Sequence, residues 1–530
     1  MENTQATLLR IAVAGWPLTL APQKSSLTNE LPVLTLNYEG LTRIDKDLRT
    51  VPAAAERWQY NSDSTSISFT LRSGLTYSDG SPLRARDFVQ AVYRVLDPRS
   101  PGNYQTLLAM IAGAEAIIDA GPEVDEARLR DLCGQLAVSA PDDRTIDFAL
   151  TRPTPYFHTL ASTWVLYPAK QERIDRGGAR WGADAANHLG NGPFQMTTID
   201  PRANLIAFKA NEYYWHGRPK LDGVHLLYID DKAAAFQSYL RGEVDILAPD
   251  PRDVPRIKAD ATLSQEFKEY PGACTMVLEF ALVKAPFNNK LVREAFTYAF
   301  DRGSYIRDVL HETEVKTLTW IPPGYPGHDP CERRYDFDPV QARHCLTAAG
   351  FPGGQGLPEI RFSYSQNPIN QARVDYIIQM YQRILGVAIT PNPVSDAGLA
   401  EMRRSVETFP QIVIGGGWCA DYPDPQNWLS VYWHSRTNIA RSVGYKNEEA
   451  DRLMDLADVE TEPEKRIELY RQAQELIVGD VAQLAHGHTK NGYLIKPWIK
   501  GLDLTAQDWV FPGQVTSLLT TVIEKEPPGR

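Results

Sequence analysis

Hydrophobic and polar positions recur along the chain with the two spacings that mark strands and helices. Ser64 to Leu71 alternates with a period of two and predicts a half-buried strand, whereas residues 84–96 predict an amphipathic helix that stops at Asp97-Pro98. Further strands are predicted at residues 8–14, 145–150, from 194, 224–229, 274–281, 359–364 and 411–415. Further helices are predicted at residues 107–120, 233–241, 289–310, 338–349, 369–385, 447–457 and 463–478. Because strands and helices alternate, the sequence predicts α/β lobes with mixed sheets.

Length and charge restrict the classes of protein that fit. A chain of 530 residues is too long for one compact core, so two or three lobes are expected. The formal net charge of −11 and the lack of a basic stripe argue against a nucleic-acid partner. No run of about 18 apolar residues is present, so no segment is predicted to span a membrane.

The start of the chain allows two interpretations of its compartment. Met1-Glu2-Asn3-Thr4 leads directly into the first predicted strand, without a basic segment followed by an apolar one. The protein is then either cytosolic or a mature domain without its export signal or lipoprotein leader. The residues alone do not separate these alternatives.

The stretch from Gly415 to Pro425 carries the most informative chemistry. Three glycines follow the apolar Ile412-Val413-Ile414, and glycine lets another chain approach the backbone closely. Trp418 offers a flat wall, and Asp421 follows two residues after Cys419. A carboxylate beside such a wall can meet a cation, for example the protonated amino terminus of a peptide, through a charge-assisted hydrogen bond. The alternative is that Asp421 and Asp424 only cap turns around the neighbouring prolines.

Several segments, in this order, resemble the cluster-C (family 5) extracellular solute-binding proteins of ABC importers, whose best known members bind dipeptides and oligopeptides. The resemblance covers nearly the whole chain, although no single segment is decisive. The matching stretches are residues 38–45, 51–58, 71–83, 190–194, 211–215, 242–246, 292–302, 417–422 and 494–498.

This resemblance implies a periplasmic-binding-protein-like α/β fold: two lobes that clamp the ligand by hinge closure, and one extra domain. Domain I is expected to combine residues 1–44, 170–271 and 490–530, domain II to cover 45–169, and domain III to cover 272–489. The implied function is that of a monomeric extracytoplasmic subunit that captures oligopeptides and delivers them to ABC permease subunits. The protein would reach the membrane only through a possible lipid anchor, and it would need no cofactor.

The resemblance also implies roles for particular residues. Asp421 is expected to hold the ammonium group of the ligand. The ligand backbone is expected to pair with a strand edge at Gly416-Gly417-Trp418-Cys419 and with a second one near Ser26-Leu27-Thr28. Tyr104 is a weaker candidate for the domain II wall of the site. Some relatives carry an arginine at the position of Gly415; its absence favours longer peptides or a different basic residue for the ligand carboxylate.

The five cysteines have no zinc-like spacing, and their residues alone allow either reduced thiols or two bridges with one free thiol. The resemblance implies a Cys274–Cys419 disulfide, which requires an oxidising compartment. A second bridge between Cys331 and Cys345 is a further expectation, with Cys133 free and buried.

Other functions are less well supported. No nucleophile elbow, HExxH or catalytic Cys/His pattern is present, so a hydrolase is not expected. His486-Gly487-His488 is a weak metal motif, interpreted as a strand with one histidine inward and one outward, and no metal site is predicted. Oligosaccharides and metal chelates remain as alternative ligands, because one fold can carry several ligand classes.

Overall fold

The computed structural model describes residues 7–102 and 104–524, without the side chain of Ala179. The chain forms two compact units. Unit 1 contains residues up to 270 and from 491 onward, and unit 2 contains residues 271–490. The chain passes between the units twice, within strands β12 (Phe267–Phe280) and β17 (Gln483–Ile495). Predicted domains I and II both fall in unit 1, and their separation stays a prediction.

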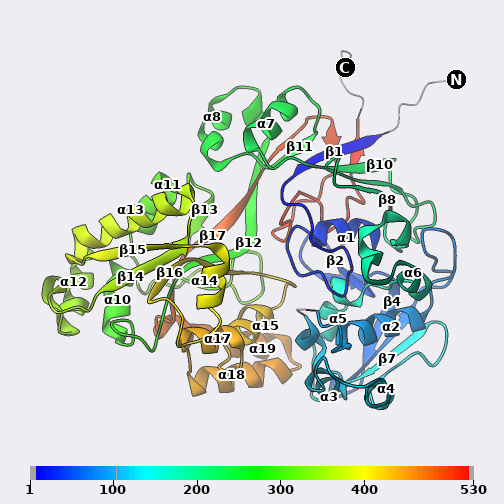
Figure 1. The fold of residues 1–530 in the computed structure, drawn as a ribbon, viewed down its shortest axis with the longest axis horizontal. Coiled ribbons are helices and arrows are strands. Elements are labelled where there is room, and N and C mark those ends of the chain that lie inside the picture. The colour runs from blue at the N-terminus through cyan, green and yellow to red at the C-terminus, as the bar shows by residue number, and fades with distance from the viewer. Residues whose placement is uncertain (1–6, 103, 525–530) are drawn as a thin grey trace. The chain divides into compact units, whose positions relative to one another are not determined.

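Unit 1 is built on a mixed sheet with the order β17-β11-β1-β10-β9-β8 (Figure 1). Strand β1 runs parallel to β10 and β11, so their carboxyl ends lie at one edge. The strands are β1 (Leu8–Val13), β8 (Phe194–Asp200), β9 (Leu205–Ala210), β10 (Gly223–Tyr228) and β11 (Ile246–Leu247). Its helices are α1 (Leu31–Asn37), α5 (Phe157–Leu160), α6 (Gln171–Gly177), α7 (Lys232–Leu240), α8 (Val254–Ala259) and α9 (Leu263–Glu266).

A second, antiparallel sheet of unit 1 has the order β4-β5-β7-β6. Its strands are β4 (Ala55–Tyr60), β5 (Ser66–Leu71), β6 (Val138–Ser139) and β7 (Thr145–Ala149). Helices α2 (Ala85–Leu96), α3 (Ala114–Asp119) and α4 (Glu126–Gly134) accompany it. Short strand pairs are formed by β2 (Thr42–Ile44) with β3 (Thr50–Pro52) and by β18 (Ile499–Lys500) with β19 (Val522–Ile523). Phe69 and Phe148 face each other edge-on in this sheet and are buried.

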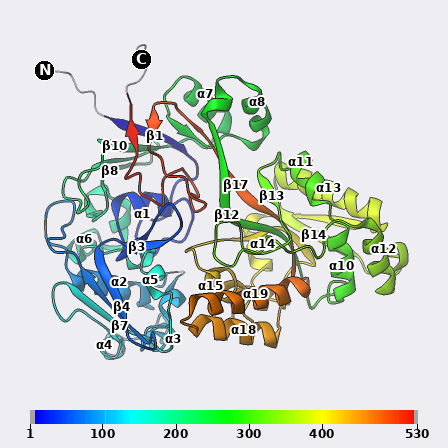
Figure 2. The same ribbon diagram turned by 180° about the vertical axis from the view of Figure 1, so that it is seen from behind.

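Unit 2 has a mixed sheet with the order β15-β14-β16-β12-β17, to which β13 adds by pairing with β17. The remaining strands are β13 (Glu314–Lys316), β14 (Ile360–Ser365), β15 (Ile389–Val394) and β16 (Ile412–Cys419). Its helices include α10 (Lys290–Tyr298), α11 (Arg302–Asp308), α12 (Pro339–Ala348), α13 (Pro368–Leu385) and α14 (Asp396–Met402). A helical layer follows, with α15 (Pro425–Trp428), α16 (Ser430–Trp433), α17 (Asn438–Val443), α18 (Glu448–Val459) and α19 (Pro463–Gly479). Figure 2 shows α15, α18 and α19 of this set from behind.

The core of unit 2 includes apolar side chains from α10 and from the residues that follow it. Val292, Phe296, Ala299 and Phe300 are all fully buried, in one cluster with side chains from the sheet and from α12 and α13. Val292 and Phe296 lie four residues apart, on one side of α10, whereas Ala299 is the C-cap of that helix and Phe300 follows it. This segment therefore has a structural role.

Two predicted helices are interrupted. Residues 107–120 form a 3₁₀ turn (η1, Gln105–Leu108) and α3, because Ile111 pairs with Leu150 as a β-bridge and Gly113 takes a φ of 91°. Residues 289–310 form α10 and α11, because the Asp301 side chain caps a new helix by accepting from the Ser304 N–H. In both cases a local polar or tertiary contact overrides the continuous apolar pattern.

Candidate ligand-binding site

The glycine-rich segment of the sequence forms the carboxyl half of strand β16 in unit 2. Cys419, Trp418, Gly417 and Gly416 pair in antiparallel register with Cys274 to Val277 of β12, after which the register shifts. Gly415 is the extra residue at this shift; it is exposed and has a φ of 92°. On its other side, β16 pairs with β14 through Ile412 and Val413. The segment from Gly416 onward thus continues beyond the pairing with β14.

Two of these glycines are required by close contacts. A Cβ atom at Gly417 would collide with the carbonyl oxygen of Thr275, and Gly417 has a φ of 145°. A Cβ atom at Gly416 would lie 2.5 Å from Oε2 of Glu279. Gly415, in contrast, has no neighbour within 4 Å of such an atom. Glycine therefore lets β12 and the Glu279 carboxylate lie directly against this strand.

A buried amide, Asn427, organises the end of the segment. Its Oδ1 accepts hydrogen bonds from Trp418 Nε1 at 2.8 Å and from the Asp421 backbone N–H at 3.1 Å. Its Nδ2 donates to Oδ2 of Asp421 at 3.1 Å. Asn427 is fully buried while Asp421 and Trp418 are half-buried. One amide thus fixes both the predicted wall and the predicted carboxylate.

The two aspartates of the segment differ in role. Asp424 is the N-cap of α15, accepts from the Gln426 N–H, and forms a buried two-point ion pair with Arg466 at 2.7 and 2.8 Å. The turn-capping interpretation is correct for Asp424. The Asp421 carboxylate instead accepts from the side chain of Asn427.

A second carboxylate lies behind the strand. Glu279 of β12 is buried, and burial raises its pKa despite the nearby Arg403 guanidinium. Arg403 Nη2 donates to Glu279 Oε1 at 2.7 Å, and Arg403 itself is about one third exposed. The charge of Arg403 is therefore matched by Glu279, whose carboxylate lies against Gly416.

The cysteines follow the implied pattern in part. Cys274 and Cys419 form a disulfide that joins β12 to β16 beside Trp418. The expected Cys331–Cys345 bridge is wrong: both are free thiols. Cys345 is buried on α12 near Gln341 and Glu294, whereas Cys331 lies in an exposed loop, so their side chains occupy different environments. Cys133 is free and half-buried rather than buried.

Ser26, Leu27, Thr28 and Tyr104 belong to unit 1. Ser26 to Thr28 form a turn before α1 and not the expected strand edge, because the N–H groups of Ser26 and Leu27 donate to Glu30 Oε2 at 2.9 and 3.1 Å. Tyr104 packs edge-on against Trp164 with ring centroids 5.0 Å apart.

Thr28 lines a cavity of about 240 Å³ whose wall includes the ends of β1 and β11. The carboxyl ends of parallel strands are the usual ligand position in α/β sheets. Thr28 is therefore still in a place suited to ligand contact, although by a turn and not by a strand.

The histidine pair of β17 is structural. His486 and His488 are both buried, since residues two apart on a strand share one face, so the expected inward and outward arrangement is wrong. His486 Nδ1 lies 2.8 Å from Glu314 Oε2, and His488 Nδ1 lies 2.9 Å from Thr275 Oγ1. Within residues 7–102 and 104–524 no group of three or more His, Cys, Asp or Glu side chains is placed to hold a metal ion.

Sequence reasoning missed Asn427, Glu279 and Arg403. Glu279 had a signal: it is a carboxylate inside the apolar run Val277-Leu278-Glu279-Phe280 of a predicted strand. Asn427 and Arg403 lie outside any motif, and only the tertiary contacts with Asp421 and Glu279 give them a role.

Comparisons with known proteins agree with this fold. The family model "Bacterial extracellular solute-binding proteins, family 5 Middle" matches residues 49–439. The chain is 26% identical to the oligopeptide-binding protein OppA of Bacillus subtilis (strain 168), over 91% of this chain and 87% of that protein. It is 28% identical to YgiS of Escherichia coli (strain K12), named as a probable deoxycholate-binding periplasmic protein, over 93% of this chain and 90% of that protein.

Among solved structures, the Escherichia coli murein tripeptide binding protein MppA has a TM-score of 0.80 at 24% identity and covers 99% of both chains. This likeness establishes the fold class that the resemblance implied. No helix in the described ranges is long and apolar enough to cross a bilayer.

The fold and the family model together define a solute-binding protein and not an enzyme. The chain belongs to the bacterial extracellular solute-binding proteins of family 5, as the sequence resemblance implied.

Proposed function

We propose that this protein captures extended oligopeptides outside the cytoplasm and delivers them to the permease of an ABC importer. The observation that carries the proposal is the orientation of the half-buried Asp421 carboxylate by buried Asn427, beside the Trp418 wall. The names of similar proteins, which include oligopeptide-binding and murein-peptide-binding proteins, support the ligand class. Domains I, II and III, closure about a hinge, a monomeric state and a periplasmic or cell-surface location are parts of this proposal.

Asp421 is proposed as the anchor of the peptide's amino terminus. A protonated amine facing this carboxylate forms a charge-assisted hydrogen bond, and Asn427 holds the carboxylate in place before the ligand arrives. Because β14 pairs only with the first residues of β16, an extended peptide can add along Gly416 to Cys419 by backbone pairing. Ser26, Leu27, Thr28 and Tyr104 are proposed as further contacts from unit 1.

The test is calorimetric titration of peptides of three to six residues into the wild type and Asp421→Asn. We expect Asp421→Asn to weaken binding by about 3 kcal/mol, because the amine loses its charged partner. Acetylation of the peptide's amino terminus is expected to weaken wild-type binding by a similar amount and to have little further effect on the variant. Asp396→Asn, an exposed aspartate of the same unit, serves as the matched control.

Equal affinity for free and acetylated peptides would remove Asp421 from this role. Mass spectrometry of ligand that co-purifies with the protein identifies the ligand class directly. A sugar, a metal chelate or a bile acid in place of peptide would contradict the proposed ligand while leaving the solute-binding family unchanged.

A further inference from the structure

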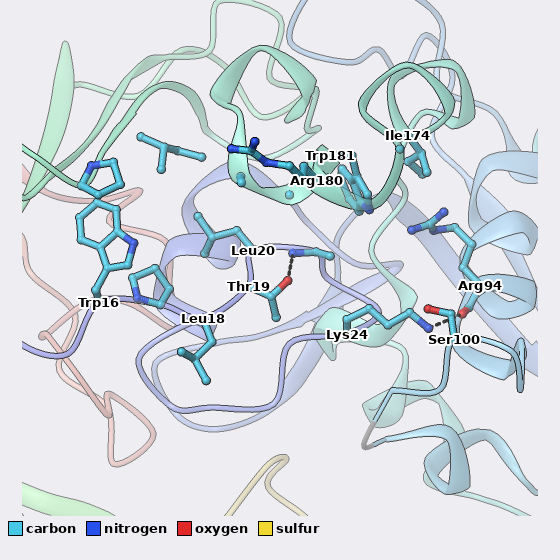
Figure 3. Close-up of a pocket in the computed structure, with 17 residues that line it drawn as sticks. Trp16, Leu18, Thr19, Leu20, Lys24, Arg94, Ser100, Ile174, Arg180 and Trp181 are labelled. Atoms are coloured by element: carbon cyan, nitrogen blue, oxygen red, sulfur yellow. Dashed lines mark hydrogen bonds between the residues drawn. The ribbon is translucent and has the colours of Figure 1, made fainter. Parts of the chain in front are cut away.

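Unit 1 contains a cavity of about 480 Å³ that includes none of the proposed peptide contacts (Figure 3). Its wall combines the loop of residues 16–24, the last turn of α2 with the loop after it, the segment 174–183 and the end of β8. Residues that define its character are Trp16, Leu20, Lys24, Arg94, Arg180 and Trp181. Its volume lies within the range of about 300–1,000 Å³ that is typical of small-molecule sites.

The cavity has an unbalanced charge. Among the 17 described residues that line it, Lys24, Arg94 and Arg180 are basic and none is acidic. This contrasts with the whole chain, in which 66 acidic residues outnumber 55 basic ones. Lys24 and Arg94 are half-buried, so their like charges are only partly screened by water.

The contacts of these two cations are with neutral groups. Lys24 Nζ donates to the Arg94 carbonyl oxygen at 3.4 Å, and Arg94 Nε donates to Gln23 Oε1 at 3.4 Å. Asp175 acts on Arg94 through space, and Asp97 acts on both cations. The Asp97 carboxylate is itself bound by the Arg99 guanidinium at 2.9 and 3.0 Å. Burial, followed by repulsion from Arg94, lowers the pKa of Lys24 to about 8. An anion between Lys24 and Arg94 would relieve this repulsion.

The rest of the wall is apolar and aromatic. Trp16 lies at the opposite end of the cavity from Lys24 and Arg94, with Leu20 and Trp181 between them (Figure 3). Trp181 is buried and its ring faces the Arg94 guanidinium, 5.2 Å from Cζ to the ring centroid. Leu18 at the same cavity is 84% exposed. One end of the cavity therefore suits a charged group and the other an apolar one.

We propose that this cavity is a second binding site, which takes a small amphipathic carboxylate. The carboxylate lies between Lys24 and Arg94, and the aromatic or aliphatic part lies along Leu20 toward Trp16. None of the proposed peptide contacts lines this cavity, so it adds a second ligand class to the protein.

The test uses 3-phenylpropionate and octanoate as probes, in calorimetric titrations of the full-length protein. We expect both to bind, and 3-phenylpropanamide, which lacks the charge, to bind at least tenfold more weakly. The double substitution Lys24→Gln/Arg94→Gln is expected to weaken the two carboxylates at least tenfold, and Trp16→Ala at least fivefold. The exposed Lys46→Gln in the same unit is the matched control and is expected to change nothing.

Leu18→Glu keeps the test decisive if the cavity variants fail to fold, because this side chain is exposed. It adds a negative charge at the cavity and is expected to weaken both carboxylates at least threefold. The affinity for peptides should stay unchanged in all these variants, which separates this site from the proposed peptide function.

Three results would overturn the second site. They are no carboxylate binding by the wild type, equal binding of the amide, and binding of inorganic phosphate as tightly as octanoate. The last would mean that the apolar wall contributes nothing to recognition.

Discussion

The two units of this protein carry candidate sites of opposite character. In unit 2 the candidate site is acidic and its geometry is fixed by neighbouring groups. The Asp421 carboxylate is oriented by a buried amide, and a disulfide joins the two strands beside it. In unit 1 the cavity is basic, and the side chains of Lys24 and Arg94 donate hydrogen bonds to neutral groups. The two units of one chain can therefore offer sites that suit ligand groups of opposite charge.

Two buried ionisable groups, Asp508 in unit 1 and His488 in unit 2, should contribute oppositely to the pH dependence of stability. Burial raises the pKa of Asp508 in unit 1 to about 7, so its contribution to the free energy of unfolding is full below pH 4 and lost as pH rises toward 7. Burial, with repulsion from His328, lowers the pKa of His488 in unit 2 to about 3. Its contribution is full above pH 6.5 and lost as pH falls toward 3. Each shift corresponds to about 4–5 kcal/mol over its window.

Urea titrations between pH 4 and 8 would measure this effect in Asp508→Asn and His488→Gln beside the wild type. The free energy of unfolding of Asp508→Asn should increase relative to that of the wild type as pH rises. That of His488→Gln should increase relative to that of the wild type as pH falls. Stability curves of both variants that run parallel to that of the wild type would contradict the opposite contributions of these two residues.

The close strand contact of unit 2 is expected to break on substitution of one glycine. Gly417→Ala should lower the free energy of unfolding by about 4 kcal/mol, because the φ of 145° and the Thr275 carbonyl both oppose a Cβ atom. Gly415→Ala in the same strand is the matched control; it has a positive φ but open space, and should cost about 1–2 kcal/mol. If denaturant unfolding finds the same loss of stability for Gly417→Ala and Gly415→Ala, the close contact between Gly417 and the Thr275 carbonyl does not stabilise the strand pair.

The disulfide is expected to matter for unit 2 and not for unit 1. Cys274→Ala/Cys419→Ala should destabilise unit 2 by about 2–4 kcal/mol and weaken peptide binding, while the binding of 3-phenylpropionate to unit 1 stays the same. Thiol titration of the denatured protein should find three thiols without reductant and five with it. A count of one thiol without reductant would show that Cys331 and Cys345 are bridged after all. A count of five would show that the Cys274–Cys419 disulfide is not formed.

Much of the architecture could be predicted from the chain because local periodicity reflects burial. Helix α2 and the strands β1, β5 and β7 lie where the apolar pattern predicts them. The segments 107–120 and 289–310 are each predicted as one helix, but the structure interrupts both. The β-bridge at Ile111 and the side-chain cap at Asp301 cause these interruptions, and the spacing of hydrophobic residues contains no information about either contact.

The α/β class and the family resemblance can be predicted from the residues alone, and Gly416–Asp421 can be singled out as a candidate site, because these depend on residue type and order. The folded contacts show which carboxylate caps a helix and which is oriented by an amide, since Asn427 contacts Asp421 and Arg466 contacts Asp424. The fold also brings Lys24 and Arg94, 70 residues apart in the chain, into one cavity with Trp16. Charged groups interact through space over a few ångströms, and the order of residues in the sequence does not give the distance between two side chains in the folded protein.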